Sequence, residues 1–345
     1  MLELKNAEKY KVVCQLWPNS EILFSGFQED DYEDYLRYIG EEISAISEHR
    51  VKFATCTFEG IVAIIHRLRA DTSWTKAAAM ENIRSHLHNG EDTAILRSME
   101  LGARLWLNLN INSASLAVGP IQANVNAVEW ESSLSLNDLI MDCFQRVSIN
   151  QIASRVVTTQ IDPSFTAASL VGLCGFTLHW TSNLADHLQF DRRRRILTVY
   201  QHKISLINHL KEGTKSVFPI DVLEEAIDTL NLLFPFGENS TRRLLYKEGK
   251  RSFYSLGNCK RDRACDIQQF SYWRNEILDV LDVFNGPAHN LRQLLADQRN
   301  LSDLLAIWIA IFVALLTLIS IGFGTIQTVF SIKQYNLAKK QTCVN

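Results

Sequence analysis

The sequence has few of the residues and motifs that normally identify an activity. Its 345 residues include 6 Pro and 15 Gly, so it contains no low-complexity or linker-like segment at which the chain can be divided. It has no G-x-S-x-G, no Gly-rich phosphate loop and no H-E-x-x-H, the motifs typical of hydrolases, nucleotide-binding proteins and metalloproteases. We therefore expect no catalytic residues and no cofactor, and we interpret the chain as a non-enzyme.

Charge and cysteine usage narrow the class of protein further. A formal net charge of −3 excludes a dedicated nucleic-acid binder, because such a protein must neutralise many phosphates. The first residues, MLELKNAEKYKVV, lack the basic and apolar regions of a secretory signal. The 7 cysteines are odd in number and scattered, which is typical of reduced thiols in a reducing compartment. These features predict a body that lies in the cytosol.

Histidine and cysteine are present, but without the spacing of a metal site. Four histidines gather in one segment, His179, His187, His202 and His209. Cys174 precedes them, and Cys259 and Cys265 stand six residues apart near Asp262 and Asp266. A structural zinc site requires paired ligands at short spacing, which neither segment supplies. We expect no metal, and we regard 179–209 as the one segment with enough ionisable groups to be a candidate enzyme pocket.

One long stretch lacks charge altogether, and it is the most informative part of the sequence. Residues 304–332 form a run of 29 without Asp, Glu, Lys or Arg. A helix rises about 1.5 Å per residue and needs roughly 20 apolar residues to cross a hydrocarbon core of about 30 Å. The run therefore predicts a transmembrane helix over 304–332, with the lipid bilayer as its partner.

Small residues recur within this run. Ser320, Gly324 and Thr328 are four residues apart, so they share one helical face that a second helix can approach closely. One interpretation is a helix-association seam that forms a homo-oligomer, and the other is that the three residues face lipid. Gln327 either hydrogen-bonds across such a seam or marks the end of the hydrocarbon region, because Lys333 follows it.

Helical patterns dominate the part of the chain before the span. The segments with apolar residues at helical spacing are 29–48, 74–109 (two helices broken at Asn89-Gly90), 130–144, 223–233 and 267–284. Ser135 with Asp138 predicts a capping box, and Asp221 with Glu224 predicts a second helix start. Residues 10–17 predict a short extended segment, whereas the apolar run 60–68 fits either a buried strand or a buried helix.

A small sheet is expected near 170–200. Residues 170–180 and 195–200 are rich in β-forming residues and are separated by the polar segment 182–191. The sharpest charge run, DRRRR at 191–195, lies between them. We interpret it as a solvated turn, and the alternative is a patch that faces anionic lipid.

Together these patterns predict a mainly α fold with a small β element. The globular body covers 1–286, with a subdivision near 120–130. No Gly or Pro occurs in 288–321, so a juxtamembrane helix over 287–303 can run directly into the span. A short polar tail follows at 333–345.

The charges that flank the span give only a small preference for one orientation in the membrane. Arg292 and Arg299 precede the span, and Lys333, Lys339 and Lys340 follow it. The short tail and the absent signal favour a tail-anchored arrangement with the body in the cytosol. The tail, KKQTCVN, matches no retrieval signal, so the sequence does not identify the organelle.

Several segments resemble a family of fungal membrane-anchored proteins with a single span. They are ARLWLNLNI at 103–111, WESSLSLNDLI at 130–140, HWTSNLADHL at 179–188, LEEAIDTLNLLFP at 223–235, YWRNEILDVL at 272–281 and LADQRNLSDLLAIWIAIFVALLTLISI at 295–321. The resemblance covers most of the chain from about residue 95 to the span. It implies a fungal source and a membrane location, and it brings no catalytic residues with it.

The long helix that leads into a span also resembles, faintly, the CorA-like metal-ion transporters, which are pentamers with two spans per subunit. The chain lacks their Gly-Met-Asn signature and has one span. A conducting pore would therefore need several copies lined by Ser320, Gly324, Thr328 or Gln327.

The function expected from the sequence is that of a membrane-anchored interaction or scaffold protein with an unknown protein partner. Two alternatives stay open: a subunit of an oligomeric CorA-like channel or transporter, and a membrane-tethered enzyme without a recognisable motif.

Overall fold

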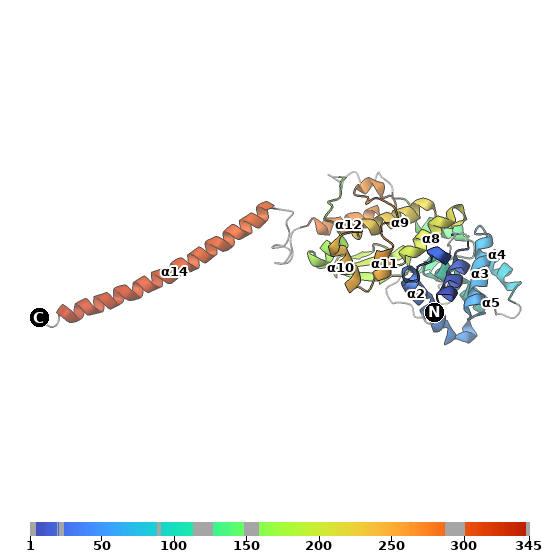
Figure 1. Ribbon diagram of the computed structural model, residues 1–345, viewed down its shortest axis with the longest axis horizontal. Helices are drawn as coiled ribbons and strands as arrows, with labels where there is room; N and C mark the ends of the chain where they lie inside the picture. The colour runs from blue at the N-terminus through green and yellow to red at the C-terminus, as the bar shows by residue number, and fades with distance from the viewer. Residues whose placement is uncertain are drawn as a thin grey trace. The chain divides into compact units, whose positions relative to one another are not determined.

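The computed structural model describes residues 5–18, 20, 24–87, 91–112, 127–147, 159–286 and 301–342. The chain divides into two compact units, Met1–Gly286 and Pro287–Asn345. The first unit, the body, is mainly helical with small sheets, and the second contains one long helix (Figure 1). The mainly α fold with a small β element is therefore confirmed.

The first half of the body contains six α-helices in its described residues. They are α1 (Asn6–Leu16), α2 (Glu29–Ser47), α3 (Phe58–Ala70), α4 (Lys76–Arg84), α5 (Asp92–Leu107) and α6 (Leu136–Cys143). Helices α3 and α5 pack side by side, as do α4 and α5. Gly102 of α5 makes this close approach possible, since a Cβ there would lie 3.2 Å from the side chain of Ile64 in α3. The two helices expected over 74–109 are thus confirmed, and the run 60–68 is a buried helix.

The expectation of an extended segment at 10–17 is wrong. These residues belong to α1, which buries Val12, Val13 and Leu16 on one face. The adjacent valines suggested a strand because β-branched residues favour strands. Tertiary packing of a helical stripe against α2 and α3 overrides that preference.

The second half of the body combines six short helices with a three-stranded sheet. The helices are α7 (Ala167–Gly172), α8 (Lys203–Glu212), α9 (Ile220–Leu233), α10 (Asn239–Lys247), α11 (Arg251–Ser255) and α12 (Arg274–Phe284). The strands are β3 (Thr177–Thr181), β4 (Phe190–Asp191) and β5 (Ile196–Tyr200), in the order β3-β5-β4. β3 pairs with β5 in parallel, with Thr177 opposite Ile196, and β4 pairs with β5 antiparallel. The small sheet is confirmed, although residues 167–172 are helical.

Single helical turns and one further pair of strands complete the described part of the body. The 3₁₀ turns are η1 (Phe24–Gly26), η2 (Arg50–Lys52), η4 (Leu184–Asp186), η5 (Gly213–Lys215) and η6 (Ile267–Gln269). The strands β1 (Ile111–Asn112) and β2 (Val128–Glu129) pair in parallel. Residues 113–126, which include most of the expected subdivision near 120–130, lie outside the described part of the chain.

The predicted helix starts are partly right. At α6, Ser135 Oγ accepts a hydrogen bond from Asp138 N (3.1 Å) and Ser135 N donates to Asp138 Oδ2 (3.2 Å), so the capping box is confirmed. At α9 the N-cap is Pro219, and Asp221 instead lies in the first turn. α12 begins at Arg274, seven residues later than expected, because 267–269 form the 3₁₀ turn η6.

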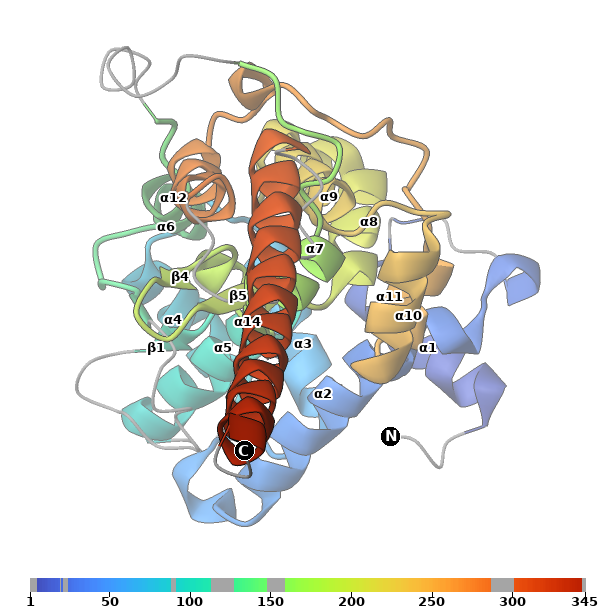
Figure 2. The same ribbon diagram turned by 90° about the vertical axis from the view of Figure 1, so that its left-hand side faces the viewer.

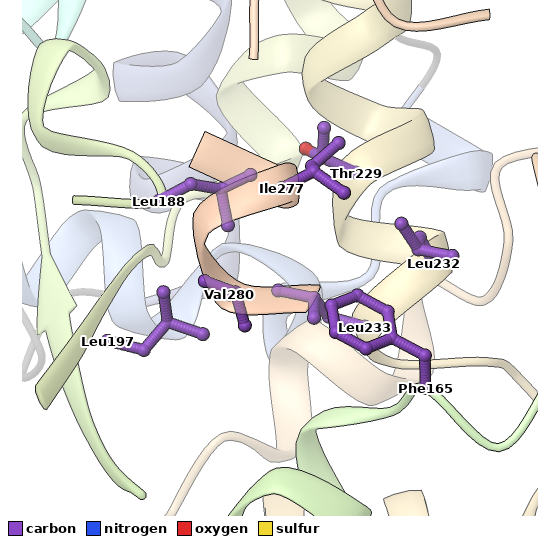
Figure 3. A pocket seen from close by; sticks show the side chains of 8 residues that line it. All are labelled: Phe165, Leu188, Leu197, Thr229, Leu232, Leu233, Ile277 and Val280. Atoms are coloured by element: carbon purple, nitrogen blue, oxygen red, sulfur yellow. The ribbon is translucent and has the colours of Figure 1, made fainter. Parts of the chain in front are cut away.

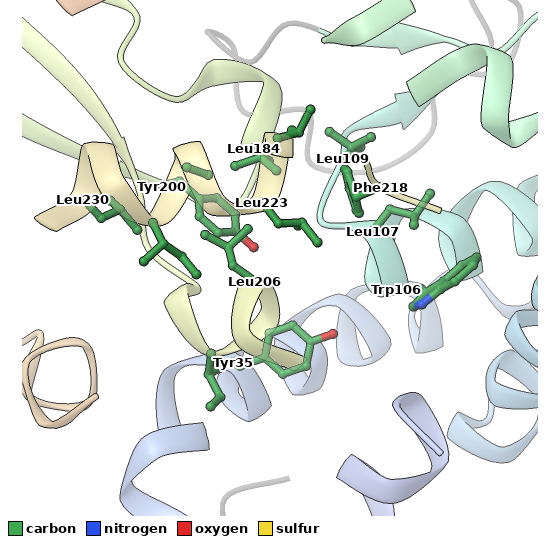
Figure 4. Close-up of a cluster of buried hydrophobic side chains, with 14 of the residues drawn as sticks. Tyr35, Trp106, Leu107, Leu109, Leu184, Tyr200, Leu206, Phe218, Leu223 and Leu230 are labelled. Carbon is green, nitrogen blue, oxygen red and sulfur yellow. The ribbon is translucent and has the colours of Figure 1, made fainter. Parts of the chain in front are cut away.

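The core lies where α2, α5, α8, α9 and β5 meet. Figure 4 shows Tyr35 of α2, Trp106 of α5 and Leu206 of α8 pointing toward the same interior as Leu223 and Leu230 of α9. Leu223 and Leu230 are fully buried, at 0% exposure. α12 lies beside β4 and closes the core on another side (Figure 2). Residues from almost the whole length of the body therefore contribute to one interior.

Candidate functional site

The C-terminal helix α14 (Leu301–Thr342) is the most distinctive candidate. Its segment Trp308–Asn336 has 29 residues and a mean hydropathy of 2.5. It is the one helix in the described part of the chain that is long and apolar enough to cross a membrane. The predicted long apolar helix over 304–332 is thus confirmed. The helix also extends through most of the expected polar tail, whereas 287–300 of the expected juxtamembrane helix lie outside the described residues.

Every described side chain of α14 is exposed. Leu318, Phe323 and Tyr335 are each 68% exposed, and none of the residues of the apolar segment is buried by other parts of the protein. Moving a Leu or Phe side chain from water into an apolar environment is favourable by about 1.5 to 3 kcal/mol. An apolar surface of this length is compatible with a membrane anchor.

The small residues lie on the predicted face of α14. Ser320, Gly324 and Thr328 recur at every fourth position of a continuous helix, and all three are exposed. A Cβ added at Gly324 would meet no atom within 4 Å. The Thr328 hydroxyl donates to the Gly324 carbonyl oxygen (2.8 Å), so it is satisfied within the helix. Association through this face stays a prediction.

Within the body, His187 is the most tightly held of the four histidines. Tyr200 N donates to its Nδ1 (3.2 Å), so Nε2 carries the proton and donates to Thr229 Oγ1 (2.7 Å). The Thr229 hydroxyl in turn donates to Ala226 O (2.7 Å). Burial lowers the pKa of His187 to about 3. This neutral imidazole joins β5 to α9.

The other histidines do not converge with it. His202 bonds Ser182 Oγ (2.9 Å) and burial lowers its pKa to about 3, whereas His209 bonds Trp106 O (3.1 Å) and burial lowers its pKa to about 4. His179 points outward on β3 and is exposed. Among the described residues, no three His, Cys, Asp or Glu side chains are placed to hold a metal ion. The segment 179–209 therefore supplies packing groups to three different parts of the core.

Sequence reasoning missed several buried charges. Lys203 is 2% exposed, and its Nζ donates to Asn231 Oδ1 (3.0 Å) and Gly257 O (2.5 Å). Burial lowers the pKa of this ammonium. Lys76 Nζ pairs with Glu100 Oε1 (2.8 Å) and also donates to Trp130 O (2.7 Å). In the sequence, each of these lysines is visible only as a charged residue on an otherwise apolar helix face. That pattern does not identify the group that the lysine binds.

Glu225 connects two helices of the core. It lies on α9, and its carboxylate accepts hydrogen bonds from the backbone N–H groups of Ser271 (2.6 Å), Tyr272 (2.7 Å) and Trp273 (2.8 Å). These groups belong to the three residues that lead into α12, whose positive N-terminal end favours a carboxylate. Burial raises the pKa of Glu225, and the three backbone hydrogen bonds oppose that shift. The residue therefore fastens the start of α12 to the centre of α9.

The basic loop at 260–264 borders an open groove of about 530 Å³. Its arginines are already engaged in holding the fold. Arg261 donates two hydrogen bonds of 2.7 Å to the carboxylate of Asp228. Arg263 donates to the carbonyl oxygens of Phe165 and Leu232 (both 2.9 Å). Cys259 and Cys265, at the ends of this loop, are free thiols as expected. Both arginines that border the groove therefore serve structure.

The run 191–195 forms the exposed turn between β4 and β5. Asp191 Oδ1 accepts hydrogen bonds from Arg193 N (2.9 Å) and Arg194 N (3.0 Å), which closes the turn. Arg192 forms an ion pair with Asp282 of α12, and Arg195 donates to the Cys174 carbonyl oxygen. The interpretation as a solvated turn is confirmed.

A small enclosed cavity lies between α9, α12 and β5. It has a volume of about 10 Å³, and it is lined by Phe165, Leu188, Leu197, Thr229, Leu232, Leu233, Ile277 and Val280 (Figure 3). Thr229 supplies the only hydroxyl, which already binds Ala226 and His187. A space of this size holds at most one water molecule and no substrate.

Comparisons of the chain with protein-family models, with curated proteins and with solved structures find no match.

Proposed function

We propose that the protein is anchored in a membrane by α14 as a single span, and that its body acts through contacts with other macromolecules at the membrane surface. The observation that carries this proposal is the combination of strong hydropathy and complete exposure in Trp308–Asn336. Within a helix the backbone N–H and C=O groups satisfy one another, so a hydrocarbon interior imposes no unpaired polar group. A bilayer supplies the apolar environment that the exposed side chains require.

The ends of the apolar segment match the thickness of a bilayer. Trp308 and Tyr335 are 27 residues apart, which is about 40 Å along a helix. This is roughly the distance between the two headgroup regions, where Trp and Tyr are enriched. Lys333 lies two residues before Tyr335 and can extend its ammonium toward the same headgroups. Both ends of the span therefore carry residues suited to an interface.

A binding role for the body is favoured over an enzymatic one. The buried ionisable groups described above are each held by structural hydrogen bonds, and the enclosed cavity is apolar and small. The proposal places the body in the cytosol, which is consistent with the free thiols among its described residues. Protease treatment of sealed vesicles tests this placement, since digestion of an N-terminal tag is expected and its protection contradicts it.

The anchor is tested by placing charges at the centre of the span. Leu318→Arg with Ile321→Arg costs about 2.5 to 3.5 kcal/mol per residue at the middle of a bilayer. We expect the double variant to be released from membranes by alkaline carbonate, whereas the native chain sediments with them. The matched control, Gln334→Arg with Asn336→Arg, adds the same charge at the end of the span and is expected to stay in the membrane. Retention of the central variant at the native level would overturn the anchor.

An oligomeric channel is the second candidate, favoured by the exposed face of Ser320, Gly324 and Thr328. It requires a fixed stoichiometry of several copies in a mild detergent, and that stoichiometry must be lost in a chain truncated after Asp303. A monomer in both cases leaves α14 as an anchor alone.

A further inference from the structure

A second surface of the body combines positive charge with exposed aromatic rings. It lies on α10, α11 and the turn before them, and it consists of Phe236, Arg242, Arg243, Tyr246, Lys247 and Arg251. We call it the basic aromatic surface. Phe236 is 55% exposed and Tyr246 is 43% exposed, although large apolar rings are normally buried.

The rings and the cations of this surface form one cluster. The guanidinium groups of Arg242 and Arg251 lie over the ring of Tyr246, 5.4 Å and 5.3 Å from its centre. Tyr254 lies between the two exposed rings, 5.2 Å from Phe236 and 6.1 Å from Tyr246 between ring centres. The surface is therefore a continuous patch in which each aromatic ring lies beside a cation or another ring.

No ion pair among the described residues engages the cations of the patch. Among the described residues, none of Arg242, Arg243, Lys247 and Arg251 forms an ion pair. The nearest acidic residues in sequence have other partners, since Glu238 lies 3.8 Å from Arg263 and Glu248 accepts a hydrogen bond from Trp180 (3.3 Å). By contrast, Arg192 in the exposed turn and Arg261 in the basic loop are both paired with aspartates.

We propose that the basic aromatic surface binds the anionic lipid headgroups of a membrane. This proposal rests on the span as an anchor, because the tether holds the body within reach of a leaflet and makes even weak attraction effective. Each basic side chain near an anionic leaflet strengthens binding roughly fivefold. Aromatic rings such as Phe236 and Tyr246 favour the boundary between headgroups and acyl chains.

The position of the surface within the body fits this role. α10 packs against α7, which begins two residues after Phe165, and Phe165 contacts Phe284 at the end of α12 (5.1 Å between ring centres). Figure 1 shows α10 and α12 at one end of the body and α3, α4 and α5 at the other. The body therefore ends, at Gly286, near the end that carries the basic aromatic surface. Trp308 of α14 lies 22 residues after Gly286 in the sequence.

The test uses the full chain reconstituted in neutral phosphatidylcholine vesicles, so that flotation with these vesicles reports the anchor independently. Fluorescent vesicles that contain phosphatidylserine but no protein are then added, and their capture by the protein-bearing vesicles is measured. We expect at least tenfold more capture than for protein-free phosphatidylcholine vesicles, and loss of the difference at high salt.

Matched charge reversals locate the effect. Arg242→Glu with Arg243→Glu is expected to reduce capture of anionic vesicles to the neutral level. Arg50→Glu with Lys52→Glu changes the net charge equally at exposed positions of η2, which packs against α5, and is expected to leave capture unchanged. An equal loss of capture in both variants would overturn the proposal. Capture by the native chain that does not distinguish the two lipids would also overturn it, and would direct the search to an acidic protein partner. Failure to float would contradict the anchor instead.

Discussion

Helix α9 buries ten of its fourteen residues in the body, whereas none of the described side chains of α14 is buried. Both helices are strongly apolar, so hydrophobicity alone does not separate them. The difference lies in their polar groups. α9 carries Glu225, Thr229 and Asn231 inside the core, and each of them binds a group from a distant segment or a neighbouring helical turn.

Three threonine hydroxyls of α14 are satisfied without other segments. Thr317, Thr325 and Thr328 each donate to a carbonyl oxygen three or four residues earlier in the same helix. A helix for a protein interior therefore depends on partners from the fold, whereas a helix for lipid must be self-contained. The comparison predicts that equivalent substitutions in the two helices have different consequences.

The largest expected effect is that of a charge in α9. Leu230 is fully buried, so Leu230→Asp should lower the free energy of unfolding of the body by about 5 kcal/mol. Leu316→Asp makes the same chemical change in α14 and should leave the unfolding midpoint of the body unaltered. Urea unfolding in mild detergent, followed by near-ultraviolet circular dichroism, measures both. An equal loss in the two variants would mean that α14 is part of the core.

A broken ion pair in the interior should cost somewhat less. Lys76 and Glu100 are 4% and 5% exposed, and Lys76→Met leaves the carboxylate buried without its cation. We expect a loss of about 4 kcal/mol in the free energy of unfolding. The double variant Lys76→Met with Glu100→Leu should recover part of it, because no buried charge remains. A double variant no more stable than the single one would show that the charge pair is not the cause.

Acid should weaken the core through its histidines. The pKa of His187 in the folded protein is about 3, below the ordinary value of 6.5, so the unfolded chain binds the proton first. Stability is therefore lost as pH falls from 6.5 toward 3, by roughly 2 kcal/mol between pH 7 and pH 5 for this residue.

The matched measurement compares His187→Gln with the native protein by urea unfolding at both pH values. The loss on acidification should be about 2 kcal/mol smaller in the variant. Burial raises the pKa values of Glu225 and Glu276, which contributes in the opposite sense, but both proteins retain these groups and the difference isolates His187. Identical losses would contradict the neutral buried imidazole.

The smallest effect is expected on the exposed face of α14. Ser320→Leu with Gly324→Leu keeps the helix apolar, so an anchor should stay in the membrane at the native level with an unchanged native mass in detergent. A fall in native mass would identify the face as an association seam and favour the channel.

The helices with the clearest apolar periodicity were predictable from the sequence. The pattern of 223–233 gave α9 correctly, because five apolar residues at helical spacing outweigh the uncertain cap at Asp221. α1 was not predictable in the same way, since its valines suit a strand until α2 and α3 are placed against them.

The polar interior was beyond sequence reasoning for a different reason. Glu225 binds amides that lie 46 to 48 residues further along the chain, and Lys76 binds a carbonyl oxygen 54 residues away. Local patterns carry no information on such pairings, which arise only when the helices pack. The apolar span was predictable because its length and lack of charge are local properties.

The attachment of α12 by Glu225 also has a mechanical consequence. α12 is the last described element of the body before α14, so with α14 as the proposed anchor, tension from the membrane reaches this helix first. The start of α12 is fastened to α9 by three hydrogen bonds, and its final residue, Phe284, is seated against Phe165. The pulling force is therefore distributed over both ends of α12 and transmitted to the middle of the core. This arrangement opposes unfolding of the body one helical turn at a time.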